Sequence, residues 1–293
     1  MNRRRFLTLA AAFACAPRFA HAATWQGRAL GAEVSVTLSG PRDAVDPALA
    51  AIPRKLEQIE DLFSLYRPNS VLARLNRDGA AVAPGLFTQL LDQVSQAHDL
   101  TDGLFDPTVQ PLWKALARGT DPAPARALIG WNRVRRDVGG RVRLGSGQAL
   151  TLNGIAQGFA TDLIRSDLQA QGFDRALIDI GEIAALGGPY RLGLQDPEFG
   201  VIGQRVLTAG AIASSSPGAL SLGTQAHILG PQGQPPLWST VSIEAQSATL
   251  ADALSTAAVF LPVERLRRLK DQAQLRRITL VDHDGNLRTI QGS

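Results

Sequence analysis

The sequence is poor in sulfur and in histidine, which narrows the chemistry that it can perform. Its 293 residues include one cysteine, Cys15, and this lies in an N-terminal stretch with the features of an export signal. Without that stretch the chain cannot form a disulfide or a thiolate metal site, or use a cysteine nucleophile. The three histidines that remain, His98, His227 and His283, are not at metal-ligand spacing from one another.

Long apolar runs and an excess of charge are also missing. No segment after residue 22 is long and apolar enough to be a transmembrane helix. Removing residues 1–22 removes four arginines and no acid, so the 30 basic residues fall to 26 and equal the 26 acidic ones. A neutral chain gives no reason to expect a nucleic-acid partner. Walker A, GxSxG and complete GxGxxG motifs are absent.

The N-terminus has the pattern of a secretory leader. Arg3-Arg4 precedes Phe6-Leu7, an apolar stretch continues to Ala16, and Ala20-His21-Ala22 offers a small-residue cleavage site. The pattern predicts a twin-arginine signal peptide over residues 1–22 and a mature periplasmic domain over residues 23–293. Two alternatives are lipidation at Cys15 and a disordered arginine-rich start.

Hydrophobic periodicity predicts a single mixed α+β domain, with helices packed on mostly antiparallel sheets. Residues 32–38 alternate as a half-buried strand, and residues 175–182 read as a strand ending at a glycine. Helical spacing predicts the helices 47–63, 85–98, 153–173, 247–260 and 263–269. A further helix is expected to begin near Pro68-Asn69-Ser70. Short strands are expected within 133–152 and up to Glu244, and a hairpin around Asp284-Gly285.

The segment SATLADALSTAAVF, residues 247–260, places three oxygen-bearing side chains in an otherwise apolar helix. Asp252, Ser255 and Thr256 are three and four residues apart, which puts them on one helical face. Carboxylate and hydroxyl oxygens suit Mg²⁺, which takes one or two carboxylates together with substrate phosphates and water. The alternative is a helix-capping role, with Asp252 accepting backbone N–H groups and Thr256 bonding back to a carbonyl.

Six blocks occur in a fixed order and together resemble one family. They are FSLYRPNSVLARLN, GLFDPTVQPLW, NGIAQGFATDLI, ALIDIGEIAALG, HILGP and SATLADALSTAAVF. Any one block alone is weak evidence of a family. NGIAQG, for example, is also typical of an ordinary turn between a strand and a helix. As a series they resemble the ApbE family of FAD:protein FMN transferases, over about residues 28–262. The resemblance implies an enzyme that cleaves FAD and, with Mg²⁺, attaches FMN to a Thr or Ser hydroxyl of a target protein.

The resemblance also implies roles for individual residues. Asp252 and Thr256 would bind the metal, with Ser255 beside them and the Gly154 carbonyl as a further ligand. His227 would lie next to the reacting phosphate as a candidate base, with Asp252 as the second catalytic residue. The positions that would contact FAD are Leu30, Tyr66, Leu104, Phe105, Asp106, Thr151, Gln157, His227 and Leu229. The target would be a periplasmic or membrane redox protein with a D-G-x-[ST]-[GS]-A-T-like segment.

Several positions depart from the family pattern, mostly at the end that would hold the flavin phosphate. Gln157 replaces a lysine, Thr151 an aspartate, Glu182 the second of two glycines, and Gly230 an aspartate. The stretch SSSPGALSLG replaces TSG followed by an aromatic residue. Two alternatives follow: a Mg²⁺-dependent FAD pyrophosphatase that releases FMN and AMP, and a non-catalytic periplasmic FAD-binding maturation factor.

Overall fold

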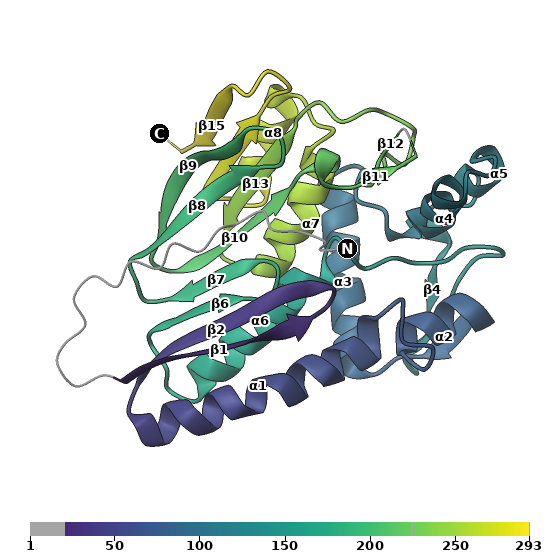
Figure 1. Ribbon diagram of the computed structural model, residues 1–293. Helices are drawn as coiled ribbons and strands as arrows, with labels where there is room; N and C mark the ends of the chain where they lie inside the picture. Colours follow the sequence, from purple (N-terminus) through teal and green to yellow (C-terminus); the bar gives the residue numbers. More distant parts are fainter. Residues whose placement is uncertain (1–20, 224, 293) are drawn as a thin grey trace.

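An antiparallel sheet of eight strands forms the centre of the molecule (Figure 1). The computed structural model describes residues 21–223 and 225–292. All strand pairings in this sheet are antiparallel. In spatial order the strands are β1 (His21–Ala29), β2 (Ala32–Gly40), β6 (Ala176–Asp179), β7 (Ile183–Leu186), β10 (Gly210–Ser215), β13 (Thr240–Ala245), β14 (Arg277–Val281) and β15 (Leu287–Gln291).

The two faces of this sheet are covered differently. Alternate residues of a strand point to opposite faces, so Ile178 and Ala213 join the main core while Leu177 and Ile212 join a smaller cluster. The main core lies under the helices α1 (Arg42–Phe63), α3 (Gly85–Leu100), α6 (Ala156–Ala170) and α7 (Ala248–Ala258). The smaller cluster lies under the hairpin of β8 (Tyr190–Asp196) and β9 (Gly200–Leu207).

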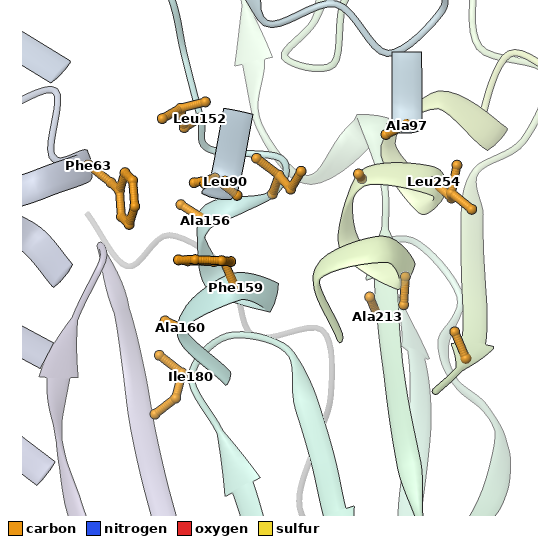
Figure 2. Close-up of a cluster of buried hydrophobic side chains, with 14 of the residues drawn as sticks. Phe63, Leu90, Ala97, Leu152, Ala156, Phe159, Ala160, Ile180, Ala213 and Leu254 are labelled. Carbon is orange, nitrogen blue, oxygen red and sulfur yellow. The ribbon is translucent and has the colours of Figure 1, made fainter. Parts of the chain in front are cut away.

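The main core is continuous from the sheet through α6 and α7 to α3. Figure 2 shows part of it, with Phe159 of α6 beside Ala156 and Ala160. Phe63 at the end of α1 packs on two aromatic rings, with centroids 5.5 Å from Phe87 and 5.7 Å from Phe159. Because α6 and α7 are buried in this core, side chains at their ends are held in fixed positions.

Smaller elements complete the fold. In Figure 1, α2 (Val71–Asp78), α4 (Gln110–Arg118) and α5 (Ala123–Arg126) lie on the far side of α3 from the large sheet. The remaining elements are β3 (Ala80–Val82), η1 (Pro107–Val109), η2 (Trp131–Arg133), β4 (Arg135–Arg136), β5 (Arg141–Arg143), η3 (Pro217–Ala219), β11 (Ser221–Leu222), β12 (Gln225–Ala226) and α8 (Val263–Gln272).

The predicted fold class is confirmed, and most predicted elements are present. Ser70 caps α2 by accepting the N–H of Ala73, as expected from the Pro-Asn-Ser signal. The expected hairpin is formed by β14 and β15. The strand predicted over 32–38 is β2, with Val34, Val36 and Leu38 buried.

Several predicted elements differ from the structure in their bounds. The helix predicted from residue 47 begins at Arg42, because Val45 extends the buried stripe across Pro47. The helix predicted over 153–173 covers only 156–170, since Ile155 has a non-helical φ of −152°. Residues 144–152 form no strand. Instead, the backbone N–H and C=O of Leu150 bond to the amide side chain of Asn76, at 2.7 and 2.8 Å.

The leader predicted over residues 1–22 lies almost wholly outside the described residues. His21 and Ala22 are described, and they pair with Gly40 and Ser39 at the end of the β1–β2 ladder. Cleavage after Ala22 therefore stays a prediction. Across the described ranges, no helix combines the length and the apolar character needed to cross a membrane.

Candidate functional site

Two adjoining pockets form one cleft at the ends of α6 and α7. The inner pocket is lined by α7, the turn before α6, the 104–110 segment and the end of β10 with Ser216. The outer pocket lies between the β1–β2 turn, the end of α1 and the start of α6. Tyr66, Trp113, Asn153 and His227 line both pockets. The cavity volumes are about 120 Å³ for the inner pocket and about 440 Å³ for the outer one, so a dinucleotide would have to occupy both.

Asp252 brings a buried carboxylate from α7 into the inner pocket. Its side chain is 2% exposed, and its Oδ2 accepts the backbone N–H of Gly158 at 3.0 Å. A Cβ atom at Gly158 would lie only 2.3 Å from the carbonyl oxygen of Ala248. Glycine at this position lets the first turn of α6 approach α7 closely enough to hold the Asp252 carboxylate.

The hydrogen-bond partners of the Ser255 and Thr256 hydroxyls in α7 determine which of these groups donates and which accepts. Ser255 and Thr256 both donate to the backbone carbonyl of Asp252, at 3.0 and 3.1 Å. A hydroxyl has one hydrogen, so Ser215, 2.8 Å from the Ser255 oxygen, must be the donor in that pair. Thr256 thus offers lone pairs at the pocket wall, whereas Ser255 is fully buried and does not line the pocket.

The turn before α6 runs directly against Thr256. A Cβ atom at Gly154 would lie 2.8 Å from the Thr256 Oγ1, so only glycine fits here without displacement. Gly154 and Asn153 both line the inner pocket. The backbone of this turn therefore lies beside Asp252 and Thr256, as the predicted metal-ligand set requires.

Asp106 organises the loop that forms the opposite wall. Its Oδ1 accepts the N–H and the hydroxyl of Thr108, at 2.8 and 2.5 Å, and its Oδ2 accepts the N–H of Trp131 at 3.0 Å. The same loop is tied to the next segment by the bond from the N–H of Thr151 to the carbonyl of Pro107, at 2.9 Å. These bonds give the wall a fixed shape.

The outer pocket is framed by a chain of polar contacts around Leu30. Leu30 has a φ of 50° in the turn between β1 and β2, and its N–H donates to Glu60 at 2.8 Å. Its carbonyl accepts from the Gln157 amide at 3.3 Å. Glu60 also pairs with Arg67. Tyr66, at the rim, is 70% exposed.

His227 has a defined tautomer when its ring is neutral. Its Nδ1 lies 3.0 Å from the carbonyl oxygen of Pro217 and 3.2 Å from that of Leu220. Carbonyl oxygens only accept hydrogen bonds, so Nδ1 carries the hydrogen. The lone pair of the neutral ring is therefore on Nε2, which makes that nitrogen the one able to take a proton.

The charge of the inner pocket is one-sided. None of the described residues that line it is a lysine or an arginine. Asp106 and Glu182 line this pocket with two more buried carboxylates besides that of Asp252, and the Glu182 Oε2 accepts the N–H of Ser214 at 3.2 Å. Among the described residues that line the outer pocket, Arg67 is the one arginine, and it pairs with Glu60 and Asp61.

A second aspartate fixes the start of α7. Asp162 of α6 accepts hydrogen bonds from the backbone N–H groups of Ala248 and Thr249 and from the hydroxyls of Ser247 and Thr249, at 2.7 to 3.0 Å. Ser247 is the N-cap residue of α7. The start of α7 is thus capped by Ser247 with Asp162. Of the alternative considered above, the bond from the Thr256 hydroxyl back to a carbonyl is present, while Asp252 accepts an N–H group from α6 and lines the pocket.

The family model of the ApbE family matches residues 30–279. The chain belongs to the ApbE family. A curated relative, the FAD:protein FMN transferase of Vibrio cholerae, is 24% identical over 279 residues, covering 83% of this chain and 81% of the relative. The FAD:protein FMN transferase of Klebsiella pneumoniae is 26% identical over 190 residues, covering 56% of this chain and 60% of the relative. The predicted assignment as a transferase enzyme is thereby confirmed.

Solved structures of family members share the fold. The Pseudomonas stutzeri flavinyl transferase ApbE in its apo form superposes with a TM-score of 0.78 at 25% identity, covering 93% of this chain and 95% of that one. The Vibrio cholerae flavin transferase ApbE gives a TM-score of 0.79 at 21% identity, covering 94% and 98%. These values confirm the ApbE-type α+β architecture.

The cleft brings together nearly all of the predicted site residues. The inner pocket is lined by Tyr66, Leu104, Phe105, Asp106, Thr151, Gly154, His227, Leu229, Asp252 and Thr256, and the outer pocket by Leu30, Tyr66, Gln157 and His227. Ser255 lies behind the wall instead. Their roles toward FAD and metal stay predictions.

Sequence reasoning missed several residues of the cleft. Trp113 ends the block GLFDPTVQPLW and Ser214–Ser216 open the stretch SSSPGALSLG, and all four line the inner pocket, but the sequence alone predicted no role for them. Glu182 was noted only as a departure from a glycine pair. The family resemblance is the signal that could have found them, because each lies inside a stretch that was compared with the family pattern.

Proposed function

We propose that this protein transfers FMN from FAD to a Thr or Ser hydroxyl of a target protein in a Mg²⁺-dependent reaction. The observation that supports this most strongly is the charge of the inner pocket. The buried carboxylates of Asp106, Glu182 and Asp252 line it, and none of its described lining residues is a lysine or an arginine. A pyrophosphate brought into such a pocket needs a bound cation to balance its charge.

The residues present fit a magnesium ion. Asp252 supplies one carboxylate, Thr256 a hydroxyl whose hydrogen is already donated, and the turn at Gly154 a backbone carbonyl. Mg²⁺ prefers few carboxylates together with substrate phosphates and water. The described residues contain no group of three or more His, Cys, Asp or Glu side chains of the kind that dedicated transition-metal sites use. When bound, the ion would neutralise charge that develops on the transferring phosphoryl group.

His227 is the candidate base. The target hydroxyl would donate its proton to Nε2, since the carbonyls of Pro217 and Leu220 keep the hydrogen on Nδ1. The hydroxyl oxygen would form a bond to the FMN phosphorus while the bond to the bridging oxygen breaks, and AMP would leave. The protein's main contribution is to hold these groups in line and out of bulk water.

The binding of FAD would use both pockets. Tyr66 offers an exposed ring at the rim for stacking, and the loop fixed by Asp106 offers a rigid wall. The leader pattern supports export by the twin-arginine route and a target on the periplasmic side of the membrane. The target segment would resemble D-G-x-[ST]-[GS]-A-T.

The test is to incubate the mature protein with FAD, Mg²⁺ and candidate target domains, and to measure intact masses and soluble products. We expect a gain on the target equal to one FMN minus one water, with one AMP released per adduct. Free FMN and AMP without an adduct would make the protein a pyrophosphatase. Binding of FAD without either product would make it a non-catalytic maturation factor.

A further inference from the structure

Three polar residues far apart in sequence form a buried chain that ends at the inner pocket. Asp196 closes β8, Thr240 opens β13 and Ser216 directly follows β10. The Thr240 hydroxyl lies 2.6 Å from the Asp196 Oδ2, and the Ser216 hydroxyl lies 2.6 Å from the Thr240 hydroxyl. All three residues are buried, and Ser216 lines the inner pocket while being only 3% exposed.

The direction of each hydrogen bond in this chain is determined. A carboxylate only accepts, so the Thr240 hydroxyl must donate to Asp196. Its single hydrogen is then used, and in the 2.6 Å contact Ser216 must be the donor. The Ser216 oxygen therefore turns only lone pairs toward other neighbours. A serine without such partners could rotate and present its hydrogen instead.

The carboxylate at the end of the chain stays ionised at neutral pH. Burial by itself would raise the pKa of Asp196, but hydrogen bonds from Thr240, Ser239 and the N–H groups of Glu198 and Phe199 outweigh it and hold the pKa below its ordinary value. Because the ionised Asp196 carboxylate can only accept, the hydrogen bonds of Thr240 and Ser216 keep the same donor-to-acceptor direction.

We propose that Asp196 and Thr240 are positioning residues, which fix the Ser216 oxygen as a hydrogen-bond acceptor for a sugar hydroxyl of bound FAD. A phosphate oxygen has no hydrogen to give, so this oxygen does not serve the phosphates. Ser216 lines the inner pocket, which the proposed function assigns to FAD. FAD carries hydroxyls on the ribityl and ribose groups on either side of its pyrophosphate. The inference rests on the proposed function, because it requires FAD in this cleft.

The chain contains its own matched control. Ser239 also donates to the Asp196 Oδ2, at 2.7 Å, and none of its observed hydrogen bonds reaches Ser216. Thr240→Val and Ser239→Ala each remove one hydroxyl from the same carboxylate oxygen. If the cluster only stabilises the fold, the two variants will behave alike. If the chain orients Ser216, only Thr240→Val will alter the pocket.

The experiment measures FAD affinity by quenching of flavin fluorescence, with urea unfolding of each variant as the folding control. Because one hydrogen bond is disturbed, we expect Thr240→Val and Ser216→Ala each to weaken FAD binding about three- to tenfold. The double variant should be no weaker than Ser216→Ala, since both changes act on one oxygen. Thr240→Ser should restore the wild-type affinity, and Ser239→Ala should keep it.

Each contrary result has a separate meaning. Equal effects of Thr240→Val and Ser239→Ala would overturn the inference, as would wild-type FAD affinity in Ser216→Ala. Unchanged FAD affinity with a raised KM for the target protein would assign the hydroxyl to the target instead of FAD. If Ser216→Ala shifted the Mg²⁺ concentration that gives half-maximal transfer, Ser216 would be a metal ligand, and the inference would be overturned. A wild-type protein that binds FAD but forms no adduct would overturn the proposed transfer alone, and one that binds no FAD would overturn both.

Discussion

Gly158 is the residue whose replacement should most clearly couple stability to activity. In Gly158→Ala, the new methyl group would lie 2.3 Å from the Ala248 carbonyl oxygen and 2.8 Å from the Asp252 Cβ. Ordinary contacts are at 3.4–4 Å. The Ala248 atom is helix backbone and cannot rotate away, so α6 and α7 would have to separate by about 1 Å to restore an ordinary contact.

The expected loss of stability follows from two opposing effects. Overpacking of this kind costs about 1–3 kcal/mol and occasionally more. Alanine recovers up to about 1 kcal/mol by its higher helix propensity. We expect a net loss of about 2 kcal/mol in the free energy of unfolding, or a fall in Tm of about 4–8 °C for a chain of this size. Since displacement of a catalytic group by about 1 Å can lower the rate about a hundredfold, transfer should fall by that order.

Urea unfolding and FMN transfer should be measured together for Gly158→Ala and for Gly85→Ala. A Cβ atom at Gly85, the first residue of α3, would have no neighbour within 4 Å. The free energy of unfolding of that control should be within about 0.5 kcal/mol of the wild-type value, and the control should be fully active. A Gly158→Ala protein as stable and as active as the control would refute the close approach of α6 and α7.

Other variants test separate parts of the account. Asp162→Ala should lower the free energy of unfolding by about 2–4 kcal/mol in urea, because the start of α7 loses its cap; a change within 0.5 kcal/mol would show that the cap is dispensable. Burial raises the pKa of Asp179 to about 6, so the folded state holds a proton that the unfolded state has lost and wild-type stability should fall as the pH rises from about 4 to 6. Asp179→Asn should flatten that fall and be about 1–3 kcal/mol more stable at pH 7; an unchanged pH profile would contradict the raised pKa. Tyr66→Ala should unfold like the wild type but bind FAD about tenfold more weakly by fluorescence quenching, since its ring is exposed at the rim; equal affinity would remove Tyr66 from the site.

Local patterns were sufficient to predict most elements, because each depends on residues close together in sequence. The apolar residues at helical spacing in α3 and the alternate apolar residues of β2 are buried, as their periodicities indicate. The cap at Ser70 needs only the next few residues. The predicted start of α1 was wrong because proline is typical of the first helical turn, whereas Pro47 lies inside this helix.

Contacts between distant segments could not be predicted from such patterns. Asp162 reads as an ordinary polar helix residue until α7 is placed against α6. The chain from Asp196 through Thr240 to Ser216 joins three strand ends from two separate sheets, which only the tertiary packing brings together. The helical spacing of Ser255 suggested a position in the pocket. In the structure α7 packs on β10, and the Ser255 hydroxyl is hydrogen-bonded to that of Ser215.

The proposed cation at Asp252 is tested most directly by the dependence of FMN transfer on Mg²⁺. Wild type and Asp252→Asn should be compared by intact mass of the target domain across a Mg²⁺ titration, with circular dichroism as the folding control. Asparagine keeps an oxygen for the Gly158 N–H but removes the charge. We predict a rate that vanishes with chelator in the wild type, and a loss of at least about a hundredfold in folded Asp252→Asn. Transfer that ignores chelator, or a folded variant with the wild-type rate, would contradict the account.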